Sequence, residues 1–122
     1  MNKKVLALAA AGEAGMGLLL LAWPPLVVRL LFGAEISGAG VIMSRIAGIA
    51  LIGLGVACWP GTSALQPLNG MLTYSPLAML YLTYVGVRGE MAGLLLWPAV
   101  VLHAVLVVLL LRARFKEEKR RP

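Results

Sequence analysis

The sequence predicts an all-α integral membrane protein, with four transmembrane helices in an up-down bundle and a short interfacial helix after the first. Two observations carry this prediction. The 122-residue chain is 61% hydrophobic and only 13% charged, and its mean hydropathy is +0.91. Soluble domains average about 45–50% apolar and about 25% charged residues, so this chain lacks the polar surface to cover a globular core. Its apolar residues also fall into four long runs within a length that suits one transmembrane domain, residues 1–122.

The first run covers residues 5–23 and is closed by Pro24 and Pro25, because proline lacks the N–H that continues a helix. Its basic start resembles that of a signal peptide, but the apolar run is long enough that we expect an uncleaved helix. Residues 25–32 then predict an amphipathic helix at the membrane interface. Arg29 should face water there, and the apolar residues that follow it should dip into lipid.

Three further runs complete the prediction, at residues 40–59, 71–87 and 91–111. All four runs are 17–21 residues long. About 20 residues rising about 1.5 Å each cross a hydrocarbon layer of roughly 30 Å. Because lipid offers no partner to backbone N–H and C=O groups, each run should be helical.

The distribution of basic residues predicts the orientation. Six of the eleven lie in the tail at residues 112–122 and two near the N-terminus, whereas the first and third loops carry one each, Arg29 and Arg88. The excess of positive charge favours the cytoplasmic side, so both termini should be cytoplasmic in a multi-pass bacterial inner-membrane protein. The basic tail should contact lipid headgroups through Arg112, Arg114, Lys116, Lys119, Arg120 and Arg121.

Small residues predict where the helices pack most closely. Gly15 and Gly17 lie in the first run, and Ser44 and Gly48 lie in the second with three residues between them. In lipid, such residues let helix backbones approach one another. We therefore expect the tightest packing between the first two spans.

Three ionisable residues within the spans, Glu13, Arg45 and His103, are candidates for an intramembrane site because charge in lipid is costly. Side chains lean toward the N-terminus of their helix, so Glu13 should lean toward the cytoplasm and Arg45 outward. We therefore favour a Glu13–His103 contact over a Glu13–Arg45 contact. Arg45 should reach toward the outer surface, near Tyr81 and Tyr84 or the acidic residue of the first outer loop.

These polar residues admit two interpretations. One is structural: hydrogen bonds between helices hold a bundle together without any further role. The other is a proton-linked site, because a carboxyl group such as Glu13 in apolar surroundings can exchange protons near neutral pH. The chain has one His, one Cys and no Asp, which leaves no residues for a disulfide, a zinc cluster or a Ser-His-Asp triad. We therefore expect no autonomous enzyme and no metal or cofactor.

Four segments carry a resemblance to a known group of proteins: Leu31–Ala34, Ser44–Gly48, Gly53–Gly55 and Gly93–Val100. Together they resemble small four-helix bacterial membrane proteins that are distantly DoxX-like. DoxX-like proteins are associated with partner subunits and quinone-linked sulfur oxidation, but no residue here carries that chemistry over. The resemblance implies mainly an architecture.

The sequence thus predicts a small non-catalytic accessory or scaffolding subunit of a larger membrane complex, because little of the chain lies outside the membrane and no complete site is visible. Its partners should be the lipid bilayer and other membrane protein subunits or itself, and not nucleic acid, because the basic residues flank apolar spans. The alternative is a small proton-linked transporter or a lipophile-binding protein centred on Glu13.

Overall fold

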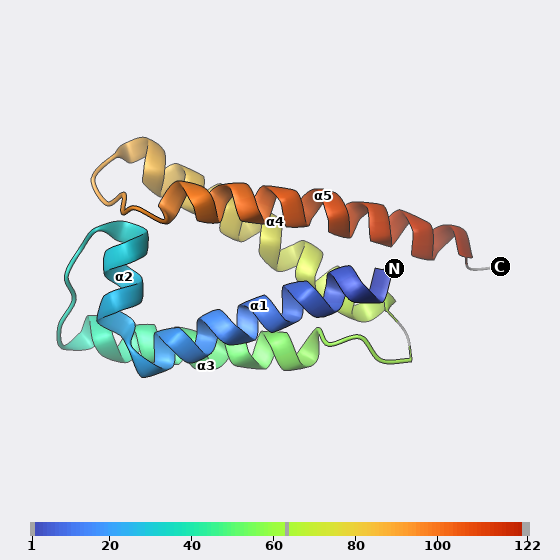
Figure 1. Ribbon diagram of the computed structural model, residues 1–122, viewed down its shortest axis with the longest axis horizontal. Coiled ribbons are helices and arrows are strands. Elements are labelled where there is room, and N and C mark those ends of the chain that lie inside the picture. Colours follow the sequence, from blue (N-terminus) through green and yellow to red (C-terminus); the bar gives the residue numbers. More distant parts are fainter. Residues whose placement is uncertain (1, 63, 121–122) are drawn as a thin grey trace.

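A computed structural model describes residues 2–62 and 64–120 and places them in five helices (Figure 1). Their bounds are α1 (Asn2–Ala22), α2 (Pro24–Phe32), α3 (Ala39–Ala57), α4 (Leu65–Arg88) and α5 (Leu96–Arg120). The described residues contain no β-strand, which confirms the predicted all-α class.

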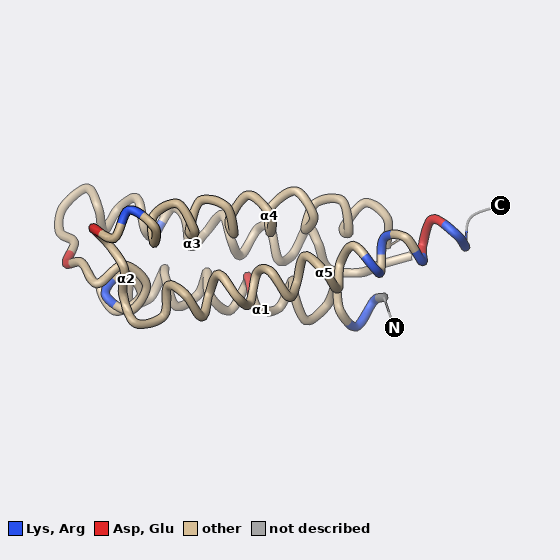
Figure 2. Tube along the Cα trace, turned by 90° about the horizontal axis from the view of Figure 1, so that it is seen from above, with Lys and Arg blue, Asp and Glu red and all other residues tan. Residues whose placement is uncertain are grey.

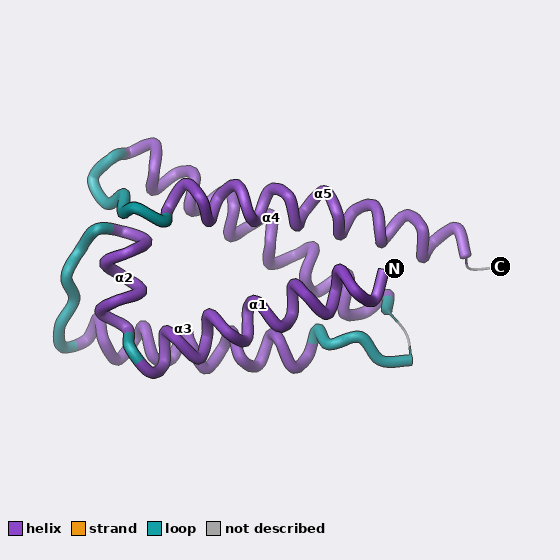
Figure 3. Tube along the Cα trace, in the orientation of Figure 1, coloured by secondary structure: helices purple, strands orange, loops and turns teal. Residues whose placement is uncertain are grey.

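The four long helices form two antiparallel pairs, α1 with α3 and α4 with α5 (Figure 1). The pairs converge at the end of the molecule that holds both termini and separate toward the other end (Figures 1 and 3). α2 lies across the separated end, between α1 and the loop that precedes α5 (Figure 3). Charged residues gather near the two ends of the bundle, with long uncharged stretches between them (Figure 2).

The main hydrophobic core lies at the converged end. Its buried apolar side chains come mostly from α1, α4 and α5, and include Leu6, Ala9, Ala10, Leu68, Met71, Leu106, Leu110 and Ala113. These contacts join the two pairs, whereas α3 and α4 barely contact one another within the described part of the chain. The bundle is therefore open along one side, unlike the predicted bundle in which all sequence neighbours pack together.

The break between α1 and α2 lies where the sequence predicted it. Trp23 leaves the helical conformation with φ −142° and ψ 68°, and Pro24 and Pro25 begin α2, where their missing N–H groups cost nothing. α2 ends at Gly33, whose φ of 64° is a left-handed conformation that glycine adopts readily. Arg29 of α2 is exposed and pairs with Glu35 at 2.8 Å.

Within residues 2–62 and 64–120, three helices are long and apolar enough to cross a membrane: Lys3–Ala22, Ala39–Ala57 and Leu96–Arg120. The prediction of a fourth such helix, over residues 71–87, is wrong by this measure. The reason lies in the composition of α4, because polar residues on it lower its hydropathy: Gln66, Asn69, Thr73, Tyr74, Ser75, Tyr81, Thr83 and Tyr84. The structure supports a membrane protein with three such helices.

The last helix differs at both ends from the predicted span of residues 91–111. It begins at Leu96, because the preceding loop donates backbone hydrogen bonds to α2. Gly93 N bonds Leu31 O at 2.9 Å, and Leu95 N bonds Leu30 O at 2.7 Å. At the other end the helix continues through the predicted tail to Arg120.

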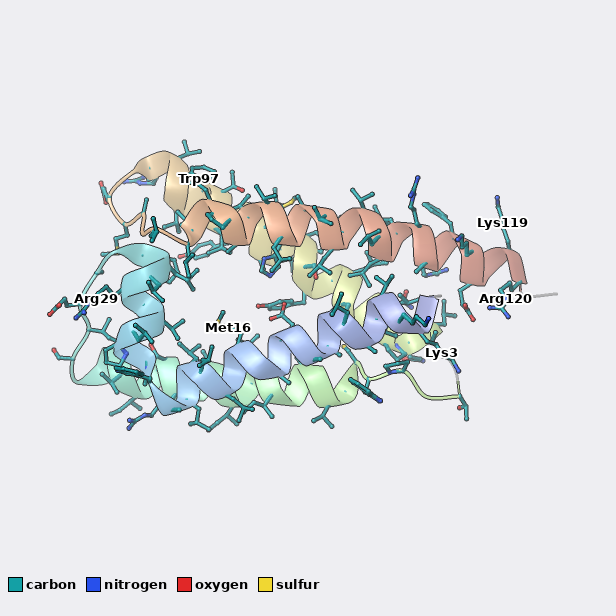
Figure 4. All side chains as sticks on the ribbon, in the orientation of Figure 1. Lys3, Met16, Arg29, Trp97, Lys119 and Arg120 are labelled. Atoms are coloured by element: carbon teal, nitrogen blue, oxygen red, sulfur yellow. The ribbon has the colours of Figure 1, made fainter. Side chains whose placement is uncertain are left out.

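The basic tail residues have two different environments. Arg112, Lys116, Lys119 and Arg120 are exposed, and the last two point away from the bundle (Figure 4). Arg114 is partly buried instead: its Nε donates to Asn69 Oδ1 at 2.9 Å, which ties α5 to the start of α4. Arg114 thus has a protein partner in addition to any headgroup, and Arg121 lies outside the described residues.

The prediction that the first two spans pack most tightly is confirmed, because α1 and α3 make the most extensive helix contact. A Cβ added at Gly17 would lie 2.5 Å from Gly48 O, and one added at Gly48 would lie 2.6 Å from Gly17 O. Gly55 approaches Ala10 in the same way. Gly15 was wrongly assigned to this contact: a Cβ added there would meet nothing within 4 Å.

Gly17→Ala should therefore destabilise the bundle, because a new methyl group would force two backbones apart. We expect a loss of about 1–3 kcal/mol, measured by unfolding in mixed micelles. Gly15→Ala, on the same helix, is the matched control and should be neutral or stabilising by up to about 1 kcal/mol, because alanine favours the helix. Equal effects of the two substitutions would show that the α1–α3 contact is not close.

Candidate functional site

A cavity of about 440 Å³ lies between the two helix pairs, toward their separated end. Pockets of about 300–1,000 Å³ with apolar walls and a few polar groups are the usual size for small-molecule sites. Residues from all five helices line this cavity, and the lining is apolar except for Glu13, Ser44, Tyr74, Tyr81 and His103. Ser44, expected at the α1–α3 contact, also lines the cavity.

α2 forms the roof of the cavity. Val27, Val28, Leu31 and Phe32 line it from this helix, and Val27 is buried. The sequence placed the last two of these side chains in lipid. They line the cavity instead, because the break at Trp23 turns α2 across the end of the bundle.

The predicted contact between Glu13 and His103 is confirmed. His103 Nε2 lies 3.5 Å from Glu13 Oε1, and the two side chains are only 12% and 9% exposed. Glu13 comes from the middle of α1, and His103 comes from the first half of α5. An acidic and a basic group therefore face each other at the inner end of an apolar cavity.

The geometry determines how many protons this pair holds. His103 Nδ1 lies 2.8 Å from Ala99 O, so Nδ1 carries a hydrogen and donates it to that carbonyl oxygen. Nε2 then faces a carboxyl group, and two unprotonated acceptors would repel one another. One further proton must therefore lie on Glu13 or on His103. At 3.5 Å the contact is longer than a good hydrogen bond, and Nε2 is buried without an aligned partner.

Tyr74 is the site residue that the sequence did not reveal, since aromatic residues of membrane proteins are expected at the interfaces. Its phenol interacts with the Glu13 carboxyl group, and its ring centroid lies 6.2 Å from that of His103. Tyr74, Ala78 and Tyr81 recur at helical spacing on one face of α4, and all three line the cavity. This helical spacing is the sequence pattern from which a common inward face of α4, and with it the place of Tyr74, could have been predicted.

Arg45 does not join this group or the outer tyrosines. Its Nε donates to Leu21 O at 3.3 Å, on the neighbouring helix α1. In a continuous helix the oxygen of Leu21 would accept from the N–H of residue 25, but Pro25 has none. Arg45 therefore supplies the donor that the proline lacks, and its role is structural.

Tyr81 and Tyr84 lie together on α4, with ring centroids 6.3 Å apart. The partner of Tyr84 is Arg88, whose Nη1 donates to its hydroxyl at 3.3 Å and whose guanidinium lies over its ring. Tyr81 lines the cavity, whereas Tyr84 lies beside a separate small pocket. The predicted polar cluster of five residues is thus divided: Glu13, Tyr81 and His103 line the cavity, whereas Arg45 and Tyr84 lie apart from it.

A second cavity, of about 330 Å³, lies along α1 and α5 on the other side of the Glu13–His103 pair. Both cavities share Glu13, Met16, Ala99 and His103 in their linings. Met16 projects from α1 into the space between the helix pairs (Figure 4). The pair and its neighbours are therefore the wall between the two cavities.

The polar groups of the site are a carboxyl group, a phenol and an imidazole, which can donate and accept hydrogen bonds. No group of three or more His, Cys, Asp or Glu residues that could hold a metal ion occurs in the described part of the chain. No family model, curated protein or solved structure matches the chain. The function must therefore be inferred from the site itself.

Removal of both members of the buried pair should cost less than the sum of the two single removals. Glu13→Leu or His103→Leu alone leaves a buried polar group without its partner, at a cost of about 1–3 kcal/mol each. In the double variant neither Glu13 nor His103 is left to face a missing partner, so its loss should be smaller than the sum. Unfolding in mixed micelles measures all three, and strictly additive losses would contradict the contact.

Proposed function

We propose that the protein binds a lipophilic small molecule within the membrane. The observation that carries this proposal is the apolar cavity of about 440 Å³ with one polar cluster, Glu13, Tyr74 and His103, at its inner end. The apolar part of such a ligand would pack against the cavity lining, and a single hydroxyl or carbonyl group would form hydrogen bonds with the cluster. Such a cluster can both donate and accept hydrogen bonds, because it combines a carboxyl group, a phenol and an imidazole.

Of the two functions that the sequence predicted, the cavity favours the lipophile-binding protein over the accessory subunit. The accessory role rested on the lack of a visible site, and the structure adds Tyr74 and an apolar cavity to the predicted Glu13–His103 contact. A subunit role stays a prediction that no contact within this chain supports. The relationship to DoxX-like proteins also stays a proposal, supported only by the sequence segments quoted above.

We further propose that α4 crosses the membrane with the other three long helices. Its 24 residues would span about 36 Å at about 1.5 Å per residue, and α5 packs along it. Ser75 is buried, and Asn69 accepts from Arg114, so part of its polarity lies within the bundle. Four crossings put both termini on one side, and the basic residues there favour the cytoplasmic side of a bacterial inner membrane.

A photoreactive probe tests the binding function. The protein is placed in nanodiscs with a long-chain alcohol that carries an alkyl diazirine, irradiated, and digested for mass spectrometry. The label should fall on cavity-lining residues of α4, such as Tyr74 and Ala78. Ala47→Phe fills the cavity from α3 and should lower this labelling about tenfold, which corresponds to about 1.4 kcal/mol of overpacking.

Ala50→Phe is the matched control, since Ala50 is also exposed on α3 but does not line the cavity. Its labelling should equal that of the unaltered protein. Labelling confined to the outer, lipid-facing surface of the helices, or equal loss in both variants, would contradict the proposal.

The Glu13–His103 pair should make binding depend on pH. Removal of the proton that lies on one of the two residues would change the donors and acceptors that the pair offers to the alcohol. Glu13→Gln keeps the shape of the side chain but removes the carboxyl group, whereas His103 can still exchange a proton. The variation of labelling with pH should therefore be smaller in Glu13→Gln and should disappear when His103→Gln is combined with it. Its absence from the unaltered protein would exclude proton-linked binding.

A further inference from the structure

The way in which a ligand reaches the cavity can be inferred from the sides of the cavity that are closed by packed helices or side chains. At the outer end, α2 is tied to the loop before α5 by the hydrogen bonds from Gly93 to Leu31 and from Leu95 to Leu30. A Cβ at Gly93 would lie 2.5 Å from Leu30 O, so the two backbones are in direct contact. With Phe32 in the lining, this roof separates the cavity from the outer aqueous side.

Close backbone packing also closes the walls within each helix pair. Gly17 and Gly48 bring α1 and α3 together without space for a methyl group. On the other pair, a Cβ at Gly86 of α4 would lie 2.7 Å from the Trp97 ring of α5. A ligand that passed either contact would have to separate two closely packed helices.

The inner end and the α1–α5 side are closed by side chains. Leu6, Leu68 and Leu110 are completely buried at the converged end. Between α1 and α5, the Glu13–His103 pair forms the wall toward the second cavity. A ligand that entered there would have to break the buried pair.

One side of the cavity remains, between α3 and α4. These helices barely contact one another, yet Met43 and Ala47 of α3 and Tyr81 of α4 line the cavity. Met43 and Tyr81 are 62% and 66% exposed, so both also face the surroundings of the bundle. In a membrane-spanning bundle those surroundings at this depth are lipid.

We infer that the ligand enters sideways from the bilayer, through the opening between α3 and α4, with Met43 and Tyr81 at its mouth. This inference rests on the proposed binding function and narrows the ligand to molecules dissolved in the hydrocarbon layer. The apolar part of such a molecule passes between α3 and α4, and its polar group then binds at Glu13, Tyr74 and His103. Tyr81 places a hydroxyl group at the entrance, and this group can guide a polar group inward.

A cleavable cross-link between α3 and α4, here called the α3–α4 lock, tests whether the ligand enters between these helices. Met43→Cys and Tyr81→Cys are combined with Cys58→Ser and joined in nanodiscs by thiol-cleavable cross-linkers of increasing length. The diazirine alcohol is added only after cross-linking. Labelling of the α4 lining residue Ala78 should fall to background in the locked protein and return when a reductant cleaves the link.

A second lock provides the control. Gly12→Cys and Leu102→Cys, in the same Cys58→Ser background, join α1 to α5 across the second cavity and should leave the labelling of Ala78 unchanged. Undiminished labelling with the α3–α4 lock in place would overturn the route, and so would a loss produced only by the α1–α5 lock. If Ala78 is unlabelled even in the unlocked protein, the proposed binding function fails, and the route fails with it.

Discussion

Two consecutive prolines remove the backbone N–H groups that would continue α1 beyond Ala22. The helix axis changes at Trp23, and α2 turns across the bundle instead of extending it. The oxygen that Pro25 leaves without a donor is bonded by Arg45 of the adjoining helix. Because α2 occupies the space between the two helix pairs at this end, they cannot close on one another, and the cavity results.

The same arrangement explains why an acid and a base can lie deep in the bundle. An isolated charge in hydrocarbon is costly, and so is an unpaired buried polar group. Glu13 and His103 limit both costs by facing one another at 3.5 Å, with Tyr74 beside the carboxyl group. The backbone oxygen of Ala99 fixes the orientation of the imidazole ring. The Glu13–His103 pair is thus held at one position along the bundle, in a cavity whose lining is otherwise mostly apolar.

Much of the fold could be predicted from residue chemistry that acts locally. Proline marked the break after α1, and the lean of side chains along a helix distinguished the Glu13–His103 contact from one with Arg45. Gly17 and Gly48 marked the close contact of α1 with α3, but Gly15, two residues away, points elsewhere, because only the rotation of the packed helix decides which glycine is used. Tyr74 was missed for a similar reason. Its place in the cavity depends on how α4 turns against α1 and α5, and neither composition nor hydropathy fixes that rotation.

The length of α2 has a consequence for the width of the molecule. Its nine residues extend about 14 Å at about 1.5 Å per residue, and each of its ends is attached to a different helix pair. α2 therefore acts as a strut of fixed length. The length of α2 therefore sets how far apart the two helix pairs lie at this end, and with it the width of the cavity beneath α2. Adding or removing residues between Trp23 and Gly33 would change that width.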